Sequence, residues 1–448
     1  MSGELRLAWL LTRGSDRREG WRVLLTAVGA GLATGLALAA TAVASLRGQY
    51  RIASANGLLN QPGERAGIVL TLLLLLVPVL GFLAQCARIG AVHRDRRLAR
   101  LRLAGAAPGQ VRRIAALEAG LACLGGSAVA APIAVPLLLG LWPAAPALLW
   151  PACALVTAAV PVLGALVSVV ALRRVVAEPL GRVRRVRPRA GRGPGPLLPL
   201  AASGLLVAGM LVAPSSVGGF GTAPVLVLSV VIGTGASAVW LSGVTSRLIG
   251  RRLAERTCDP AVLIAAERLR DDPWTAARTH AAVLLVTVAG TGFMGVRQVL
   301  LGTLHQRGPQ SLAMDISFYT TGIDLTGAAL LLALAIALCG LAVGTAESPA
   351  TRRRALAAQA AAGVPAAVLA RALLLETALP LAPAVALAGL GGMGIATWYA
   401  LLADTGGTAL PPAPLLVPFV VYAACLLAAA TSLPLLRRSL SPAELRHA

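Results

Sequence analysis

Long apolar runs alternate with short arginine-rich segments along the whole chain. Ten runs are long and apolar enough to be membrane-spanning helices: roughly 22–46, 67–90, 114–140, 147–171, 196–213, 222–246, 280–302, 325–346, 372–401 and 412–435. A bilayer-spanning helix needs about 20 predominantly apolar residues. The pattern therefore predicts an all-α polytopic membrane protein with about ten transmembrane helices. The first run is longer than the apolar region of a signal peptide, so we expect it to remain as an anchor.

The composition supports this prediction, because 57% of the 448 residues are hydrophobic and only 13% are charged. The net charge is +22 and comes from arginine alone, since the sequence contains no lysine. The arginines precede the first run, separate the second from the third, and follow the fourth, sixth and tenth. With ten spans, all these segments fall on one side, which predicts a cell-membrane protein with both termini cytoplasmic. The positive charge is thus explained without a nucleic-acid partner.

The chain contains an internal repeat with a constant offset of 258 residues. The offset maps Arg94 and Arg96 onto Arg352 and Arg354, and Glu118 onto Glu376. After the fourth span of each half it becomes 264. The repeat predicts two parallel four-helix units joined by a two-helix connector. Their expected bounds are 1–175 for the first unit, 176–195 for a cytoplasmic Arg/Gly/Pro linker, 196–248 for the connector and 249–448 for the second unit.

Each half also carries two amphipathic segments outside its spans. One precedes the leading span and places Leu5, Leu7, Ala8 and Leu11 in the first half, and Leu263, Ala266 and Leu269 in the second, on one helical face. This predicts a helix at the membrane interface, or else a cytoplasmic start of the span itself. The other segment reverses the chain between the second and third spans. Gly105 is expected to end a helix with a positive φ, and Pro108-Gly109 to turn the chain.

The residues of this reversal resemble the FtsX-like, MacB-type permeases of ABC transporters. The resemblance rests on "RRLARLRLAGAAPGQVRRIAALEAGLACLGG" (96–126) and "RRRALAAQAAAGVPAAVLARALLLETALPL" (352–381), supported by the pre-span segments 5–18 and 263–276. The ten-span layout is similar to the bacitracin-resistance, BceB-type branch. Many members carry a large extracytoplasmic domain, whereas the corresponding loops here span only about 47–66 and 303–324.

The resemblance implies that the two reversals are coupling elements that dock on separate ATP-binding subunits. The residues it assigns to coupling are Arg94, Arg96, Arg97, Gly105, Pro108, Arg112, Arg113, Glu118, Arg352, Arg353, Arg354, Gly363, Pro365, Arg371 and Glu376. Two copies of an ABC ATP-binding protein would bind one permease chain, and ATP and Mg²⁺ would sit on those partners. The chain itself is expected not to be an enzyme, because a phosphate-binding P-loop requires a lysine.

The expected function is movement of a lipid-like or amphipathic peptide substrate at the membrane, since the short loops leave no large external domain. A non-transporting, ATPase-coupled regulator or signalling scaffold is the alternative. A secondary transporter would need broken helices and buried ionisable pairs that the sequence does not suggest. Glu118 and Glu376 either act as a switch, pairing with a coupling arginine in one conformational state, or form static ion pairs at the membrane interface near the cytoplasm. Gln85, His280 and Arg297 are expected near span ends and receive no role. The six cysteines lack metal-site spacing.

Overall fold

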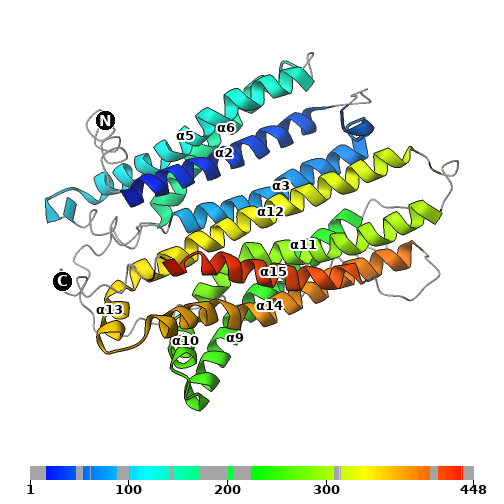
Figure 1. Ribbon diagram of the computed structural model, residues 1–448. Helices are drawn as coiled ribbons and strands as arrows, with labels where there is room; N and C mark the ends of the chain where they lie inside the picture. The colour runs from blue at the N-terminus through cyan, green and yellow to red at the C-terminus, as the bar shows by residue number, and fades with distance from the viewer. Residues whose placement is uncertain are drawn as a thin grey trace. The chain divides into compact units, whose positions relative to one another are not determined.

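The fold is that of a computed structural model (Figure 1), which describes residues 17–46, 54–60, 62–87, 100–101, 103–141, 146–171, 200–202, 204, 223–306, 312, 314–403, 412–434 and 436. Residues Met1–Arg187 form one compact unit, and Pro188–Ala448 form a second. We call them unit 1 and unit 2 and describe each by itself. The boundary between them lies within the segment that the sequence predicts to be a linker.

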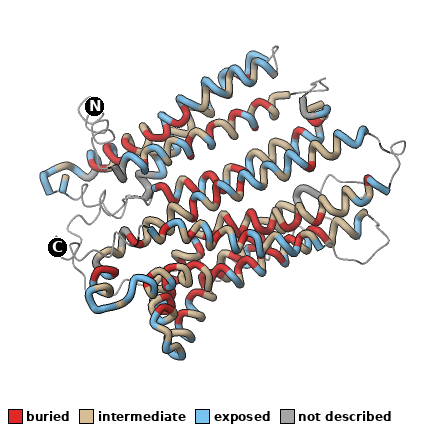
Figure 2. The backbone as a smooth tube through the Cα atoms, viewed as in Figure 1, coloured by how far each residue is buried: buried red, intermediate tan, exposed pale blue. Residues whose placement is uncertain are grey.

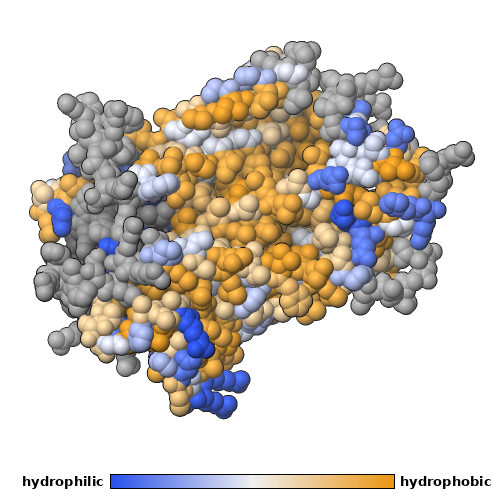
Figure 3. Space-filling model, in the orientation of Figure 1, coloured by the Kyte–Doolittle hydropathy of each residue, from blue (hydrophilic) through white to orange (hydrophobic). Residues whose placement is uncertain are grey.

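The protein is an all-α polytopic membrane protein, as the sequence predicts. All regular elements in the described ranges are helical. Nine helices in those ranges are long and apolar enough to cross a bilayer. Apolar residues cover the middle of the helices on the face drawn in Figure 3, and hydrophilic residues lie toward the helix ends. The fifth predicted span, 196–213, falls almost entirely outside the described residues.

Unit 1 is built around helix α2 (Arg17–Ser45), which packs against α3 (Pro62–Cys86), α5 (Pro108–Leu141) and α6 (Leu149–Ala171). A 3₁₀ turn, η1 (Ser54–Gly57), lies in the loop before α3. The backbones of α2 and α5 approach closely, because a Cβ added to Gly126 would lie only 2.0 Å from the Ala27 carbonyl oxygen. A hydrogen bond of 2.9 Å between the hydroxyls of Thr34 and Ser127 joins the same two helices.

Unit 2 has the corresponding four long helices and additional elements around them. The four are α11 (Pro273–Gln306), α12 (Ile316–Thr351), α14 (Ala366–Leu402) and α15 (Ala413–Ala430). Helix α9 (Ala223–Arg256) packs against both α11 and α14, and the shorter α10 (Pro260–Asp271) packs against α9 and α14. Buried positions follow α9, α11 and α14 in Figure 2, where a single apolar core joins these helices. A short helix, α13 (Arg353–Ala361), lies between α12 and α14.

The starts of the third and fourth long helices of each unit agree with the offsets read from the sequence. Helix α5 begins at residue 108 and α14 at residue 366, which is the 258-residue offset. Helix α6 begins at residue 149 and α15 at residue 413, which is the later offset of 264. Several helices extend beyond the predicted spans; α14, for example, starts six residues before the expected 372. Their polar ends continue the helix beyond the apolar segment that the bilayer core requires.

The pre-span segment of the second half is a separate helix rather than the start of α11. Asp259 caps α10 by accepting a hydrogen bond from the Ala261 amide at 2.8 Å, and α10 ends before Pro273 begins α11. Ala266 and Leu269 are buried, whereas Leu263 is 40% exposed. The face that packs against α9 and α14 is centred on small alanines, and Leu263 lies at its edge. The matching segment 5–18 lies almost wholly outside the described residues.

Candidate coupling site

The reversal before the third span has the same backbone geometry in both units. Gly105 has φ +96° and Gly363 has φ +87°, a region that L-residues with a side chain rarely adopt. The amide of Ala106 donates to the Leu101 carbonyl at 3.0 Å, and that of Val364 donates to the Gln359 carbonyl at 3.1 Å. These bonds are the six-residue closure of a Schellman motif. The prediction that glycine ends the helix here with a positive φ is confirmed in both copies.

A small apolar cluster holds each reversal against the start of the following helix. In unit 1, Val111 is fully buried and packs with Leu101 and Ala106. In unit 2 the equivalent of Val111 is Leu369, also fully buried, which packs with Leu356 of α13. Each reversal is therefore a folded, packed turn rather than an open loop. We call residues 100–113 the first knob and residues 353–371 the second knob.

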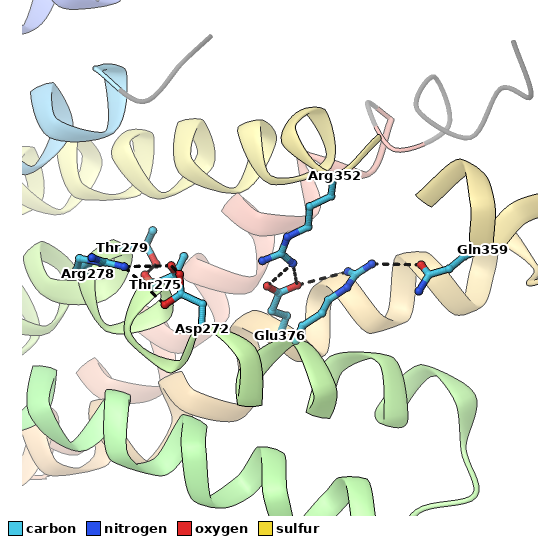
Figure 4. A network of polar contacts seen from close by, with 8 residues as sticks. Asp272, Thr275, Arg278, Thr279, Arg352, Gln359 and Glu376 are labelled. Atoms are coloured by element: carbon cyan, nitrogen blue, oxygen red, sulfur yellow. Dashed lines mark hydrogen bonds and ion pairs between the residues drawn. The ribbon is translucent and has the colours of Figure 1, made fainter. Parts of the chain in front are cut away.

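Glu376 connects the second knob to the elements around it. Its carboxylate lies on α14 and accepts from Arg352 at 2.9 and 3.2 Å and from Arg268 of α10 at 3.5 Å. Arg268 also donates to the side-chain oxygen of Gln359, on α13, at 3.5 Å. Figure 4 shows the side chain of Arg352 pointing toward the Glu376 carboxylate, with Gln359 farther along the same chain of contacts. The network thus links α10, the junction of α12 with α13, and α14.

The electrostatic balance at Arg268 favours this connection. Burial lowers the pKa of its guanidinium, and the adjacent Glu376 carboxylate opposes that decrease. The two side chains are only 14% and 18% exposed, so water screens their attraction less than it would at the surface. A second contact, between exposed Arg371 of the knob and Asp259 at 3.0 Å, also connects α14 with the start of α10. Because Arg371 is 64% exposed, that pair contributes little stability.

Glu118 forms a different contact in unit 1. It pairs with Arg22 of α2, and their side chains are only 2% and 7% exposed. This pair is interhelical, and Arg22 lies in the first span and outside the predicted coupling set. Glu376 pairs with Arg352, which belongs to that set.

The remaining predicted coupling residues fall into three groups. Gly105, Pro108, Arg112 and Arg113 come together at the first knob, where Arg113 is exposed and Arg112 half-buried. Arg353, Gly363, Pro365 and Arg371 come together at the second knob, as does the backbone of Arg354. Arg94, Arg96 and Arg97 lie outside the described residues.

Sequence reasoning did not single out Arg22, which pairs with Glu118 in unit 1, or Arg268 and Asp259, which form ion pairs with α14 in unit 2. Repeat matching could not have found them, because their equivalents differ. The offset of 258 places His280 at the position of Arg22, and Leu10 at the position of Arg268. The useful signal was the pattern of α10, where Arg268 lies at the edge of the face that carries the buried Ala261 and Ala265.

No protein-family model matches the chain, and no curated protein matches it significantly. The case for a function therefore depends on the residues and geometry described above.

Proposed function

We propose that this chain is the transmembrane subunit of an ABC transporter, driven by two copies of a separate ATP-binding protein. One permease chain would bind both copies, one at each knob, in the cell membrane with both termini cytoplasmic. The substrate class is a lipid-like or amphipathic peptide molecule that is moved at the membrane. The chain supplies no nucleotide site, and ATP and Mg²⁺ belong to the partners.

The observation that carries the proposal is the pair of knobs with matching backbone geometry. Two glycines 258 residues apart have the same positive φ and close the same hydrogen bond. Each precedes a long helix that crosses the membrane. Two equivalent projections of this kind suit a pair of equivalent partners, and the arginine placement puts both on the cytoplasmic side.

The contacts in unit 2 provide a route from the knob into the membrane. Displacement of α13 moves Gln359 and, through Arg268, moves α10. Glu376 lies on α14 itself, so the same displacement acts on a helix that continues to residue 402. In this mechanism ATP-driven closure of the partners draws the knobs together, and each knob moves its four-helix unit as a packed body.

The test is charge reversal at the exposed arginine of each knob. Arg113→Glu combined with Arg371→Glu should abolish most of the ATPase stimulation seen when the chain is co-purified with the ATP-binding protein encoded beside it. The matched control is Arg251→Glu with Arg252→Glu, two adjacent exposed arginines at the end of α9 that lie outside both knobs. Equal stimulation in both double variants would contradict docking at the knobs.

Transport and regulation are separated by a second measurement. Proteoliposomes that contain the complex and a fluorescent phospholipid or amphipathic peptide should show ATP-dependent redistribution across the bilayer. An intact ATPase response without redistribution of either class would favour the alternative of a non-transporting regulator. The proposed orientation of the termini is tested with the variants Ser2→Cys and Ala448→Cys, whose introduced thiols are labelled from each side of the membrane.

A further inference from the structure

Unit 2 contains an apolar hollow whose lining includes two charged residues. It lies between α11, α12 and α15 and has a volume of about 550 Å³. Volumes of roughly 300–1,000 Å³ are typical of small-molecule sites. Val286, Phe293 and Val417 are among the apolar residues that line it, while Arg297 and Asp324 are its charged residues. The lining of the hollow thus combines apolar and charged side chains, which suits an amphipathic ligand.

The charged residues lie toward the helix ends opposite α10 and α13. Arg297 is nine residues before the end of α11, and Asp324 is eight residues after the start of α12. At about 1.5 Å per residue both lie about 12–14 Å from the helix ends. Gln298, next to Arg297, accepts a hydrogen bond from the amide of Ala413 at 3.2 Å and so holds the first residue of α15 beside α11. The charges therefore mark one end of the hollow.

The length of the hollow fits one leaflet of a bilayer. Val286 and Arg297 both line it and are 11 residues apart on α11, which is about 16 Å along the helix axis. Half of a bilayer's hydrocarbon core is about 15 Å thick. An extended acyl chain from one leaflet would thus reach from the charged end to Val286.

Neither charge is needed to pair the helices. No side-chain hydrogen bond or ion pair joins Arg297 or Asp324 to another residue in the described part of the chain. The repeat offset places Ala39 and Ala66 at their positions in unit 1, which has the same four-helix arrangement without either charge. Arg65 in unit 1 shows what a structural arginine does there: it donates to the carbonyls of Leu59 and Asn60 at 2.6 and 2.9 Å.

We infer that this hollow binds a zwitterionic phospholipid, phosphatidylethanolamine. Arg297 binds the phosphate, for which the planar guanidinium is well suited. Asp324 accepts a hydrogen bond from the primary ammonium of the headgroup, and one acyl chain fills the apolar part. The ammonium carries N–H donors that a choline headgroup lacks, and phosphatidylglycerol carries no cation to meet the carboxylate. The inference rests on the membrane-spanning fold and does not require coupling to an ATPase.

Native mass spectrometry of the purified full chain tests the assignment. The chain is stripped of lipid in detergent and mixed with dioleoyl phosphatidylethanolamine, phosphatidylcholine or phosphatidylglycerol. The unmodified chain should retain phosphatidylethanolamine best. Arg297→Gln should weaken retention of all three about tenfold, the effect of losing one charge-assisted hydrogen bond. Asp324→Asn should abolish the preference for phosphatidylethanolamine over phosphatidylglycerol.

Two further variants keep the test decisive. Gly290→Leu retains both charges and fills the hollow, because a Cβ at Gly290 meets only Val417, at 3.6 Å; it should lower retention of every lipid. Arg278→Gln removes an exposed arginine near the opposite end of α11 and should change nothing. Equal retention of phosphatidylethanolamine and phosphatidylglycerol by the unmodified chain would overturn the inference, as would equal losses in Arg297→Gln and Arg278→Gln. Because the experiment contains no ATP-binding protein, its outcome is independent of the proposed transport function.

Discussion

Glu118 and Glu376 occupy equivalent positions in the two units but hold different elements together. Glu118 binds Arg22 and so joins α5 to α2 inside the helix bundle. Glu376 binds Arg352 and Arg268 and so joins α14 to the knob and to α10. The equivalent of Arg352 in unit 1 is Arg94, which lies outside the described residues. The two glutamates share a position in the repeat, and each contacts an arginine that has no arginine counterpart in the other half: the 258-residue offset places His280 at Arg22 and Leu10 at Arg268.

The second half has a different residue at the position that corresponds to Arg22. His280 occupies it and is 98% buried, with its Nδ1 atom lacking a hydrogen-bond partner among the described residues. Glu376 is the unit 2 counterpart of Glu118. It is bound by Arg268 of α10 and by Arg352 at the α12–α13 junction. At this position the two halves keep a buried residue but not the arginine.

The largest effect is expected for Arg22→Met, which removes a charged partner of the buried Glu118 carboxylate. Removing one partner of a buried ion pair costs about 3–5 kcal/mol. The free energy of unfolding, measured by detergent denaturation, should fall by that amount. The double variant Arg22→Met with Glu118→Leu should recover most of the loss, because both charges are then absent. A neutral single variant would show that the pair does not stabilise unit 1.

An intermediate effect is expected at the knobs, where the units are alike. Gly105→Ala and Gly363→Ala should each cost about 1–2 kcal/mol, because alanine is strained in the left-handed region. Gly394→Ala is the control: it lies in a helix with no positive φ and has space for a methyl group. The control should be neutral or stabilising in the same unfolding measurement. Unequal losses at the two knobs would contradict their equivalence.

The smallest effect is expected for His280→Met, the counterpart of Arg22→Met. Replacing a buried polar group that lacks a partner by an apolar one is nearly neutral or stabilising. We expect a change within about 0.5 kcal/mol in the unfolding free energy. A loss comparable to that of Arg22→Met would show that His280 has taken over the role of the arginine.

Much of the fold could be predicted from the sequence, because apolar runs and glycine turns are local signals. The offsets of 258 and 264 recur in the starts of α14 and α15, and Gly105 and Gly363 have the expected positive φ. Arg22 and Arg268 could not be predicted as partners of the two glutamates. Arg22 is 96 residues from Glu118, and Arg268 is 108 residues from Glu376, so only helix packing brings each pair together.

The exposure of Leu263 shows how helix packing sets the centre of the buried face of α10. Helical periodicity gives a face, but its centre depends on which helices lie opposite. Gly250 of α9 approaches the Ala266 carbonyl oxygen so closely that an added Cβ would lie 2.7 Å from it. This close approach turns the alanines of α10 inward and leaves Leu263 on the rim.

The glycine-closed turns of the knobs have a consequence for how such a chain can change over generations. The segment "AGAAPGQ" (104–110) and its counterpart "AGVPAAV" (362–368) share only their first two letters, yet their backbones close in the same way. One glycine and main-chain hydrogen bonds hold the backbone of each turn, so the neighbouring residues can be substituted without changing its conformation. Descendants of a single ancestral half can thus diverge in surface chemistry at each turn, and a partner that fits one turn by shape can still distinguish it from the other.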